Sequence, residues 1–250
     1  LHPSNPRIRC SHQPGQGTLL TSNPTQQPFM PALESGDRLT RAEFERRYQL
    51  HPAIKKAELI EGVVYVASPV RIKRHAEPHG DLITWLGVYK ASTPGVTLGD
   101  NATVRLDLDN EPQPDGLLRL EEACGGQSRI SDDDYIEGAP ELVAEIAASS
   151  ASYDLHDKLN SYRRNGVREY LVWLVEDREF RWYDLQEGQF AQQAADGNGI
   201  LASKVFPGLR LAVTALLQGD MVAVLTELQQ GIGTEAHQQF AAGLTAKLAG

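Results

Sequence analysis

The stretch that decides the fold is LVAEIA, residues 142–147. It is an apolar run of strand length that contains one charged side chain, Glu145. A short apolar run is typical of a buried β-strand. A carboxylate on a buried strand is costly to desolvate unless a cation neutralises it. The run therefore predicts a buried strand and, at Glu145, a charged site.

Three more charged residues belong with Glu145. Asp115 leads into another apolar run, residues 116–118, and Lys158 lies 13 positions after Glu145. Glu58 begins a third candidate strand. Two buried carboxylates favour a bound cation, and a nearby lysine suits a phosphate or a water. Together the four residues predict a metal site of the nuclease type.

Strands and helices alternate around these residues. A hairpin is expected with its turn at Glu61-Gly62, because Gly in the turn separates two apolar segments. The other expected elements are a helix at 81–91, strands at 96–98 and 103–106, a surface loop at 121–138, a helix from Ser152 to Asn165, and strands at 170–175 and 180–185. This mixture predicts an α/β or α+β fold, with a central mixed β-sheet flanked by helices.

Composition divides the chain into three parts. Residues 1–36 are rich in Pro, Ser, Gln and Asn and are expected to form a disordered tail, with Met30 as a candidate natural start. Residues 37–230 are expected to form a single folded domain. Residues 231–250 form either a last amphipathic helix or a frayed end.

Charge and cysteine content limit the function classes. The net charge of −9 argues against nonspecific nucleic-acid binding by the whole surface, but it allows a local basic groove. No apolar run is long enough to span a membrane. The two cysteines, Cys10 and Cys124, are not arranged as a metal or disulfide motif, so a cytoplasmic protein is expected.

Several motifs carry a family resemblance when they are taken in order. They are Glu58-Leu59-Ile60-Glu61-Gly62, Pro114-Asp115, Glu145-Ile146, residues 153–158, Tyr162 and Gly166-Val167-Arg168-Glu169-Tyr170. From residue 40 to 217 the chain resembles the Uma-type restriction endonuclease family, within the PD-(D/E)xK nuclease superfamily. The resemblance implies a restriction-endonuclease-like core, Mg²⁺ dependence and phosphodiester hydrolysis. It assigns Glu58, Asp115, Glu145 and Lys158 to the active site.

The lysine departs from the usual superfamily pattern. Two residues after Glu145 the superfamily normally has lysine, but this chain has Ala147. The resembling family supplies its lysine from the following helix, and Lys158 fits that position. Lys158 lies three positions after Leu155 and four before Tyr162, so it leans toward the buried face of the helix.

The expected cofactor is Mg²⁺, with Mn²⁺ as the alternative. Asp115 and Glu145 would supply carboxylate oxygens, and the carbonyl of Ile146 a third ligand. Glu58 would hold a metal-bound water or a second ion. Lys158 would orient the attacking water or stabilise charge on the phosphate.

Three residues are candidates for contact with the substrate. Arg74 and His75 lie in the one concentrated basic stretch, which is either a phosphate-contacting rim or a solvated loop. Tyr162 is the third candidate. His79 is spaced four residues from His75, as in a helical metal pair, but Pro78 is expected to break that helix.

Each site residue also has a structural alternative. Glu58 can be a solvated hairpin residue, and Asp115 a cap at the start of a strand. Lys158 can be a partner of Asp154 or Asp157.

The sequence as a whole predicts a Mg²⁺-dependent DNA endonuclease. DNA is the expected partner, no membrane is involved, and a homodimer remains open. Two alternatives are kept: a non-catalytic nucleic-acid-binding or scaffold domain of the same fold, and a metal-dependent hydrolase of small phosphoesters. An open groove would favour a polymer and a closed cavity a small substrate.

Overall fold

A six-stranded sheet forms the centre of the structure, a computed structural model that describes residues 30–67, 71–148 and 151–250. In spatial order the strands are β11 (Gln189–Gln192), β10 (Glu179–Gln186), β9 (Glu169–Leu174), β8 (Leu142–Ala147), β5 (Gly116–Leu120) and β3 (Val96–Asp100). β8 and β9 are parallel, and every other neighbouring pair is antiparallel. The sheet is therefore mixed, as the sequence predicts.

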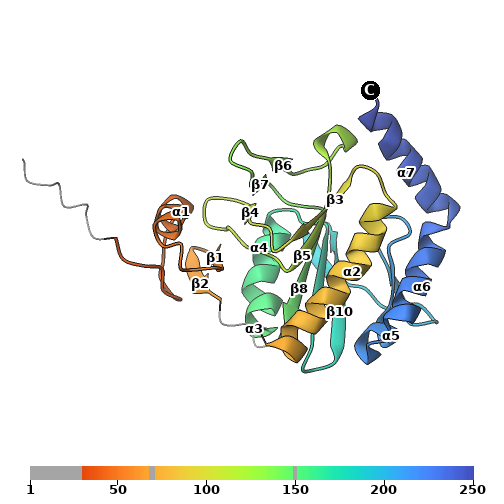
Figure 1. Cartoon of the computed structure of the whole chain (residues 1–250), viewed down its shortest axis with the longest axis horizontal. Helices are drawn as coiled ribbons and strands as arrows, with labels where there is room; N and C mark the ends of the chain where they lie inside the picture. Colours follow the sequence, from red (N-terminus) through yellow and green to blue (C-terminus); the bar gives the residue numbers. More distant parts are fainter. Residues whose placement is uncertain (1–29, 68–70, 149–150) are drawn as a thin grey trace, which may run out of the picture. The chain divides into compact units, whose positions relative to one another are not determined.

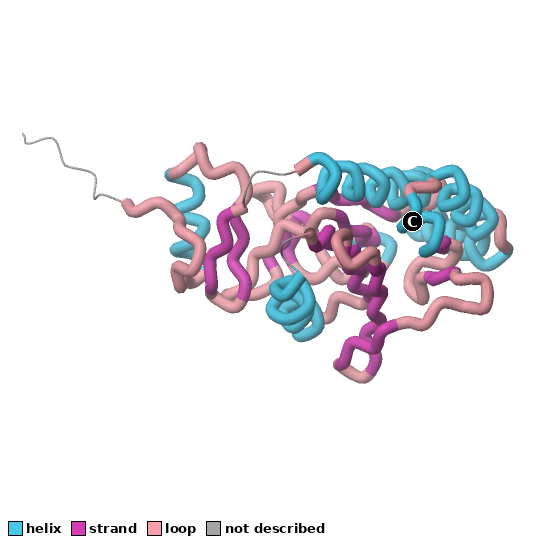
Figure 2. The backbone as a smooth tube through the Cα atoms, turned by 90° about the horizontal axis from the view of Figure 1, so that it is seen from below, coloured by secondary structure: helices cyan, strands magenta, loops and turns pink. Residues whose placement is uncertain are grey.

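Helices cover both faces of this sheet (Figures 1 and 2). The helices that pack on one face are α2 (Glu77–Ala91), α5 (Val213–Gln218), α6 (Met221–Ile232) and α7 (Glu235–Leu248). The other face carries the connection from β8 to β9, which is α3 (Ala151–Tyr153), a π-helical turn η3 (Asp154–Lys158) and α4 (Leu159–Arg164). Parallel neighbours need such a crossover, since a tight turn cannot join them.

The alternation of side chains along β8 decides where Glu145 points. Ala144 and Ile146 belong to the core that packs under α2, whereas Val143 and Ala147 belong to the core under α4. Successive side chains of a strand face opposite sides of the sheet. Glu145 therefore lies on the same face as Val143, beneath the η3–α4 segment.

A smaller layer brings Glu58 to the sheet. It consists of α1 (Arg41–Leu50) and the hairpin of β1 (Ala57–Ile60) and β2 (Val63–Val66). The turn has positive φ at both Glu61 (52°) and Gly62 (71°), as the favoured two-residue hairpin turn requires. Leu59 and Glu111 exchange backbone hydrogen bonds of 3.2 and 2.7 Å, which join the hairpin to the rest of the fold.

The remaining elements are short. They are η1 (Ile72–Ala76), η2 (Glu122–Cys124), and the strands β4 (Val104–Arg105), β6 (Arg129–Ile130), β7 (Ile136–Glu137), β12 (Ile200–Ala202) and β13 (Arg210–Ala212). The segment expected as a surface loop, 121–138, thus contains η2 and two small strands. No helix within the described ranges has both the length and the apolar character to cross a membrane.

Two expected boundaries differ from the structure. The expected tail, residues 1–36, extends too far toward the folded domain, because Leu33 is only 4% exposed and the Gly36 amide donates to the carbonyl of Val64. Residues 1–29 lie outside the described residues, so disorder there stays a prediction. The chain divides after Met30, and every helix and strand of the described residues belongs to the unit Pro31–Gly250. The last segment forms helix α7, one of the two expected outcomes.

Glu169 at the start of β9 gives a prediction about stability. Its buried carboxylate accepts hydrogen bonds from Ser203 Oγ (2.6 Å) and the Lys204 amide (2.7 Å). Burial raises the pKa of Glu169 to about 7, since these bonds offset the desolvation only in part. Because the pKa of Glu169 is raised in the folded state, the folded protein loses stability as the pH rises from the unfolded pKa of 4.5 through the folded pKa of about 7.

We therefore expect ionisation of Glu169 to lower the free energy of unfolding of the wild-type protein by about 3 kcal/mol between pH 4.5 and 8. The Glu169→Gln protein should not show this decrease. Urea unfolding of both proteins across this range measures the difference. Parallel stability profiles for the two proteins would contradict the prediction.

Candidate active site

The register between β5 and β8 places Asp115 beside Glu145. Gly116 lies opposite Ala144 in this antiparallel pair, so one residue further along Asp115 comes opposite Glu145. Asp115 Oδ2 accepts a hydrogen bond of 2.8 Å from the Ile146 amide, and both carboxylates are 3% exposed. Directly opposed residues have their Cβ atoms about 4.5–5.5 Å apart, so the two carboxylates share one end of the sheet.

Lys158 reaches Glu145 from the helical segment above it. Its Nζ lies 2.9 Å from Glu145 Oε1, and the Tyr162 hydroxyl donates to the same oxygen at 2.8 Å. Both residues face the sheet, because they lie on the same side of η3 and α4 as Leu155 and Leu159, which pack against the core. The side chain of Lys158 is 4% exposed, so it is held within the site rather than in solvent.

Glu58 is the second strong partner of Lys158. Glu58 Oε1 lies 2.9 Å from Lys158 Nζ and accepts a 2.7 Å hydrogen bond from the Gln113 amide. Glu58 is 8% exposed, so the alternative of a solvated hairpin residue is wrong. Of the two structural partners considered for Lys158, Asp154 lies 3.9 Å away, whereas Asp157 meets the hydroxyl of Tyr65.

Asp115 has its own basic neighbours. Lys56 Nζ lies 3.3 Å from Asp115 Oδ1, and His75 Nε2 lies 3.2 Å from Asp115 Oδ2. Burial favours a raised pKa, but the hydrogen bond with His75 and the positive charge of Lys56 hold the pKa of Asp115 well below its usual range. Asp115 is therefore ionised in the folded protein at neutral pH.

The pKa of Glu145 is shifted in the opposite direction from that of Asp115. Burial and the neighbouring carboxylates Asp115, Asp154 and Glu58 together raise the pKa of Glu145 to about 8, although the positive charge of Lys158 acts in the opposite direction. Burial would lower the pKa of Lys158, but Glu145 and Glu58 raise it well above its usual value. The site thus contains more carboxyl groups than ammonium groups, and this excess favours a bound cation.

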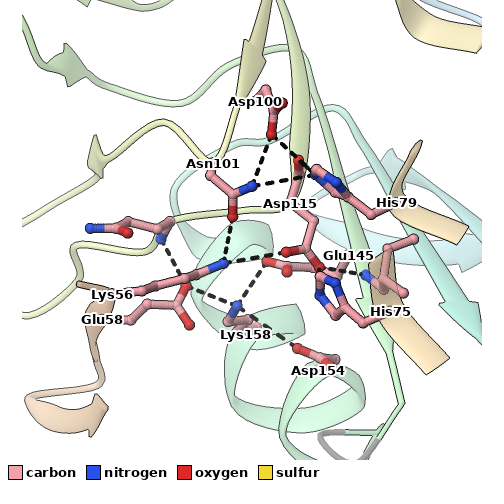
Figure 3. Close-up of polar contacts among 12 residues, drawn as sticks. Lys56, Glu58, His75, His79, Asp100, Asn101, Asp115, Glu145, Asp154 and Lys158 are labelled. Carbon is pink, nitrogen blue, oxygen red and sulfur yellow. Dashed lines mark hydrogen bonds and ion pairs between the residues drawn. The ribbon is translucent and has the colours of Figure 1, made fainter. Parts of the chain in front are cut away.

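His79 and Asn101 extend the site toward the end of β3 (Figure 3). His79 Nε2 lies 3.0 Å from the Asp115 carbonyl oxygen and 3.1 Å from Asp100 Oδ1. The rings of His75 and His79 stack with centroids 5.8 Å apart. The expectation that Pro78 breaks the helix between them is wrong, because Pro78 lies in the first turn of α2, which directly continues η1.

These side chains line a cavity of about 840 Å³. Its carboxylates come from β1, β8, η3 and the residue just before β5, and its basic side chains come from three places along the chain. The basic lining residues are Lys56, Arg71, Arg74, His75, His79 and Lys158. A cavity that joins buried carboxylates to several basic groups is suited to an anionic substrate together with a cation.

Tyr162 and Arg74 differ from the substrate contacts expected of them. Tyr162 is fully buried, so its hydroxyl positions Glu145 and no substrate can reach it. Arg74 lines the cavity, but it is half-exposed and pairs with Glu176 at 2.8 Å. Of the three expected substrate contacts, His75 lies deepest, next to Asp115.

The sequence reasoning missed Lys56 and Asn101, and it considered His79 only as a partner of His75 in a metal pair. Lys56 had a usable signal, since residues two apart on a strand share a face and Lys56 stands two before Glu58. Asn101 had none, because it follows β3 in a turn and reaches the site only through the tertiary fold.

The donor set fits a hard cation such as Mg²⁺. Asp115 and Glu145 offer adjacent carboxylate oxygens and Ile146 a main-chain carbonyl on the same strand, and Mg²⁺ prefers oxygen ligands. Among the described residues no three His, Cys, Asp or Glu side chains converge as a metal cluster. A site of two carboxylates and a carbonyl does not require such a cluster.

Comparison with models of known protein families shows which family this chain belongs to. Residues 41–214 match the model of the Uma2 family, which is described as "Putative restriction endonuclease". The chain belongs to the Uma2 family. The Uma2 match runs from the first residue of α1 into α5 and includes every residue of the site. The family resemblance predicted from the sequence motifs is confirmed.

A solved structure shares the fold of this Uma2 protein. It is the crystal structure of a protein from Anabaena variabilis, described as a putative nuclease belonging to DUF820. The TM-score is 0.55 at 13% sequence identity, and the similarity covers 72% of this chain and 98% of the other. The predicted fold class is confirmed by this likeness. Among curated proteins, none matches the chain.

Proposed function

We propose that this Uma2 protein is a Mg²⁺-dependent nuclease that hydrolyses phosphodiester bonds of DNA. The observation that supports this most is the pairing of Asp115 with Glu145 across β5 and β8, with Lys158 bridging Glu145 to Glu58. Two adjacent carboxylates with a neighbouring ammonium provide the charges that a phosphodiester reaction needs.

Each residue of this set has a proposed task. Asp115, Glu145 and the Ile146 carbonyl would hold Mg²⁺, with Mn²⁺ as an alternative ion. When bound, the ion neutralises phosphate charge and lowers the pKa of a water. Two of the three N–H groups of Lys158 face Glu58 and Glu145, and we assign the third to orienting the attacking water. Tyr162 keeps Glu145 in place through its hydrogen bond.

The basic side chains at the cavity support a nucleic-acid substrate. Arg71 and Arg74 come from the chain around η1 and line the same cavity as the carboxylates. Phosphate contacts of this kind position a nucleic acid without reading its sequence. They also explain how a chain with net charge −9 can bind DNA, because the positive charge is local.

Cleavage of supercoiled plasmid tests the proposal. The wild-type protein is expected to nick plasmid with Mg²⁺ and to lose this activity in excess chelator. Glu145→Gln should be inactive in the same assay, since it removes the negative charge of a proposed ligand while preserving the size of the side chain. Asp177→Asn, at an exposed turn residue, is the matched control and should retain activity.

The outcomes separate the alternatives. Nicking that persists in chelator would contradict a metal-dependent nuclease. Metal-dependent cleavage of a small phosphodiester such as bis-p-nitrophenyl phosphate, without cleavage of DNA, would favour the small-phosphoester hydrolase. DNA binding without turnover of either substrate would favour the non-catalytic domain.

A further inference from the structure

The two ammonium groups of the site have different surroundings. Lys158 is 4% exposed and lies between Glu58 and Glu145, so its position is fixed by buried carboxylates. The side chain of Lys56 is 26% exposed and contacts one carboxylate, Asp115, at 3.3 Å. Figure 3 shows Lys56 reaching the site from the chain before β1, whereas Lys158 reaches it from η3.

The position of Lys56 is fixed at both ends of its side chain. At the backbone, its carbonyl accepts a hydrogen bond of 3.0 Å from the Ala67 amide, which extends the β1–β2 hairpin. At the tip, Nζ donates to Asn101 Oδ1 at 2.9 Å. Lys56 is therefore held in the cavity by partners that do not themselves require a substrate.

Asn101 holds Lys56 from an unusual backbone conformation. Its φ is +51°, a value that Asn adopts more readily than most residues other than glycine. Its amide nitrogen lies 2.8 Å from Asp100 Oδ1 and 3.3 Å from His79 Nε2, so the amide is oriented with its oxygen toward Lys56. Backbone in this region costs free energy and is often found at functional sites.

We propose that Lys56 is a substrate-binding residue that contacts the phosphate of the phosphodiester, and that Asn101 positions it. The assignment rests on the proposed function, because it takes a DNA phosphodiester as the substrate. Asn101 and Asp115 use two of the three N–H groups of Lys56, and the third is the donor to the phosphate oxygen. Lys158 then serves the water and Lys56 the phosphate.

The surroundings of Lys56 fit an anion. The cavity is also lined by Arg71, so the positive charge is not confined to Lys56. A phosphate that approaches Asp115 would be repelled by this ionised carboxylate unless a cation lay beside it. Lys56 provides this cation as a compact charge with rotatable donors.

DNA binding in the absence of metal tests the contact directly. The assay is fluorescence anisotropy of a labelled 20-base-pair duplex in excess EDTA over a range of salt concentrations. Lys56→Met is expected to weaken binding about tenfold at 0.1 M salt and to reduce the slope of log K against log salt by about one, as for one lost phosphate contact. Lys56→Arg should retain the wild-type slope, because it keeps the charge.

Lys55 gives a matched control one residue away. It is exposed, its Nζ donates to the carbonyl of Pro52, and it is not among the residues that line the cavity. Lys55→Met removes the same charge and should retain the wild-type slope. If Lys56→Met behaves like Lys55→Met, the assignment is overturned.

Two further variants test how Lys56 acts. Asn101→Gly keeps the positive φ without strain, and its effect on binding should be absent when Lys56→Met is already present, because Asn101 acts through Lys56. In an Asp115→Asn background Lys56→Met should still weaken binding. Loss of its effect there would mean that Lys56 only neutralises Asp115, which overturns the contact.

The test also separates this assignment from the proposed function. Wild-type protein that binds and cleaves DNA while Lys56→Met keeps its salt slope would overturn only the role of Lys56. Wild-type protein that binds no DNA would overturn the proposed substrate and the role of Lys56 together.

Discussion

Replacing Lys158 with methionine is expected to cost about 3–5 kcal/mol of unfolding free energy near pH 9, above the pKa of Glu145, because it leaves buried carboxylates without their ammonium partner. Glu58 and Glu145 each lie 2.9 Å from Lys158 Nζ, and Asp154 lies 3.9 Å away. The cost should shrink toward pH 5, since protonation of these carboxyl groups removes the uncompensated charge.

Urea unfolding in EDTA measures this effect. Lys90→Met, at an exposed position of α2, is the matched control and should stay within about 0.5 kcal/mol of wild type. If Lys158→Met is too unstable to study, Lys158→Met/Glu145→Gln should recover a large part of the loss, because it removes one of the unpaired charges. A Lys158→Met protein as stable as the control would contradict this account.

The Lys158→Met substitution is also expected to change catalysis. Lys158→Met is expected to retain affinity for Mg²⁺, or to gain some, because a like charge is removed from the site. Turnover should still fall by roughly 100-fold or more, as for loss of one preorganised donor. Isothermal titration with Mg²⁺ and the plasmid assay, at a temperature where the variant is folded, separate these two effects.

The parts of the site that the sequence predicts are those encoded by local pattern. The apolar run that contains Glu145 identifies a strand, and the spacing of Leu155, Lys158 and Tyr162 identifies the face of the following helix. Both inferences depend only on side-chain periodicity. The structure agrees, since Lys158 meets Glu145 across that face.

The parts that the sequence does not predict depend on tertiary register. Whether Asp115 comes opposite Glu145 depends on the pairing of β5 with β8, which no local pattern specifies. Asn101 contacts Lys56 from the end of β3, and His79 contacts Asp115 from α2. The relative placement of these two elements follows from packing of the whole core. The burial of Tyr162 likewise follows from its place between α4 and the sheet.

The last prediction concerns Asp115, whose surroundings reverse a simple expectation from charge. Two carboxylates side by side should repel each other, so removal of one should stabilise the metal-free fold. In the structure, Asp115 is compensated by Lys56, His75 and the Ile146 amide. Its pKa lies well below the usual range, so its ionised form stabilises the fold above the unfolded pKa of about 3.9 and this contribution is lost as the pH falls.

Asp115→Ala is therefore expected to lower the free energy of unfolding by about 2–4 kcal/mol at pH 7 in EDTA, with the difference from wild type shrinking as the pH falls below about 4. It should also abolish Mg²⁺ binding in isothermal titration and reduce plasmid nicking by at least about 1000-fold, because a ligand of the ion is lost. Asp177→Ala, at an exposed turn residue, is the control for removal of one negative charge. An Asp115→Ala protein that binds Mg²⁺ like wild type would refute the metal site. One that is more stable than wild type at pH 7 would instead show that repulsion between the carboxylates outweighs their cationic partners.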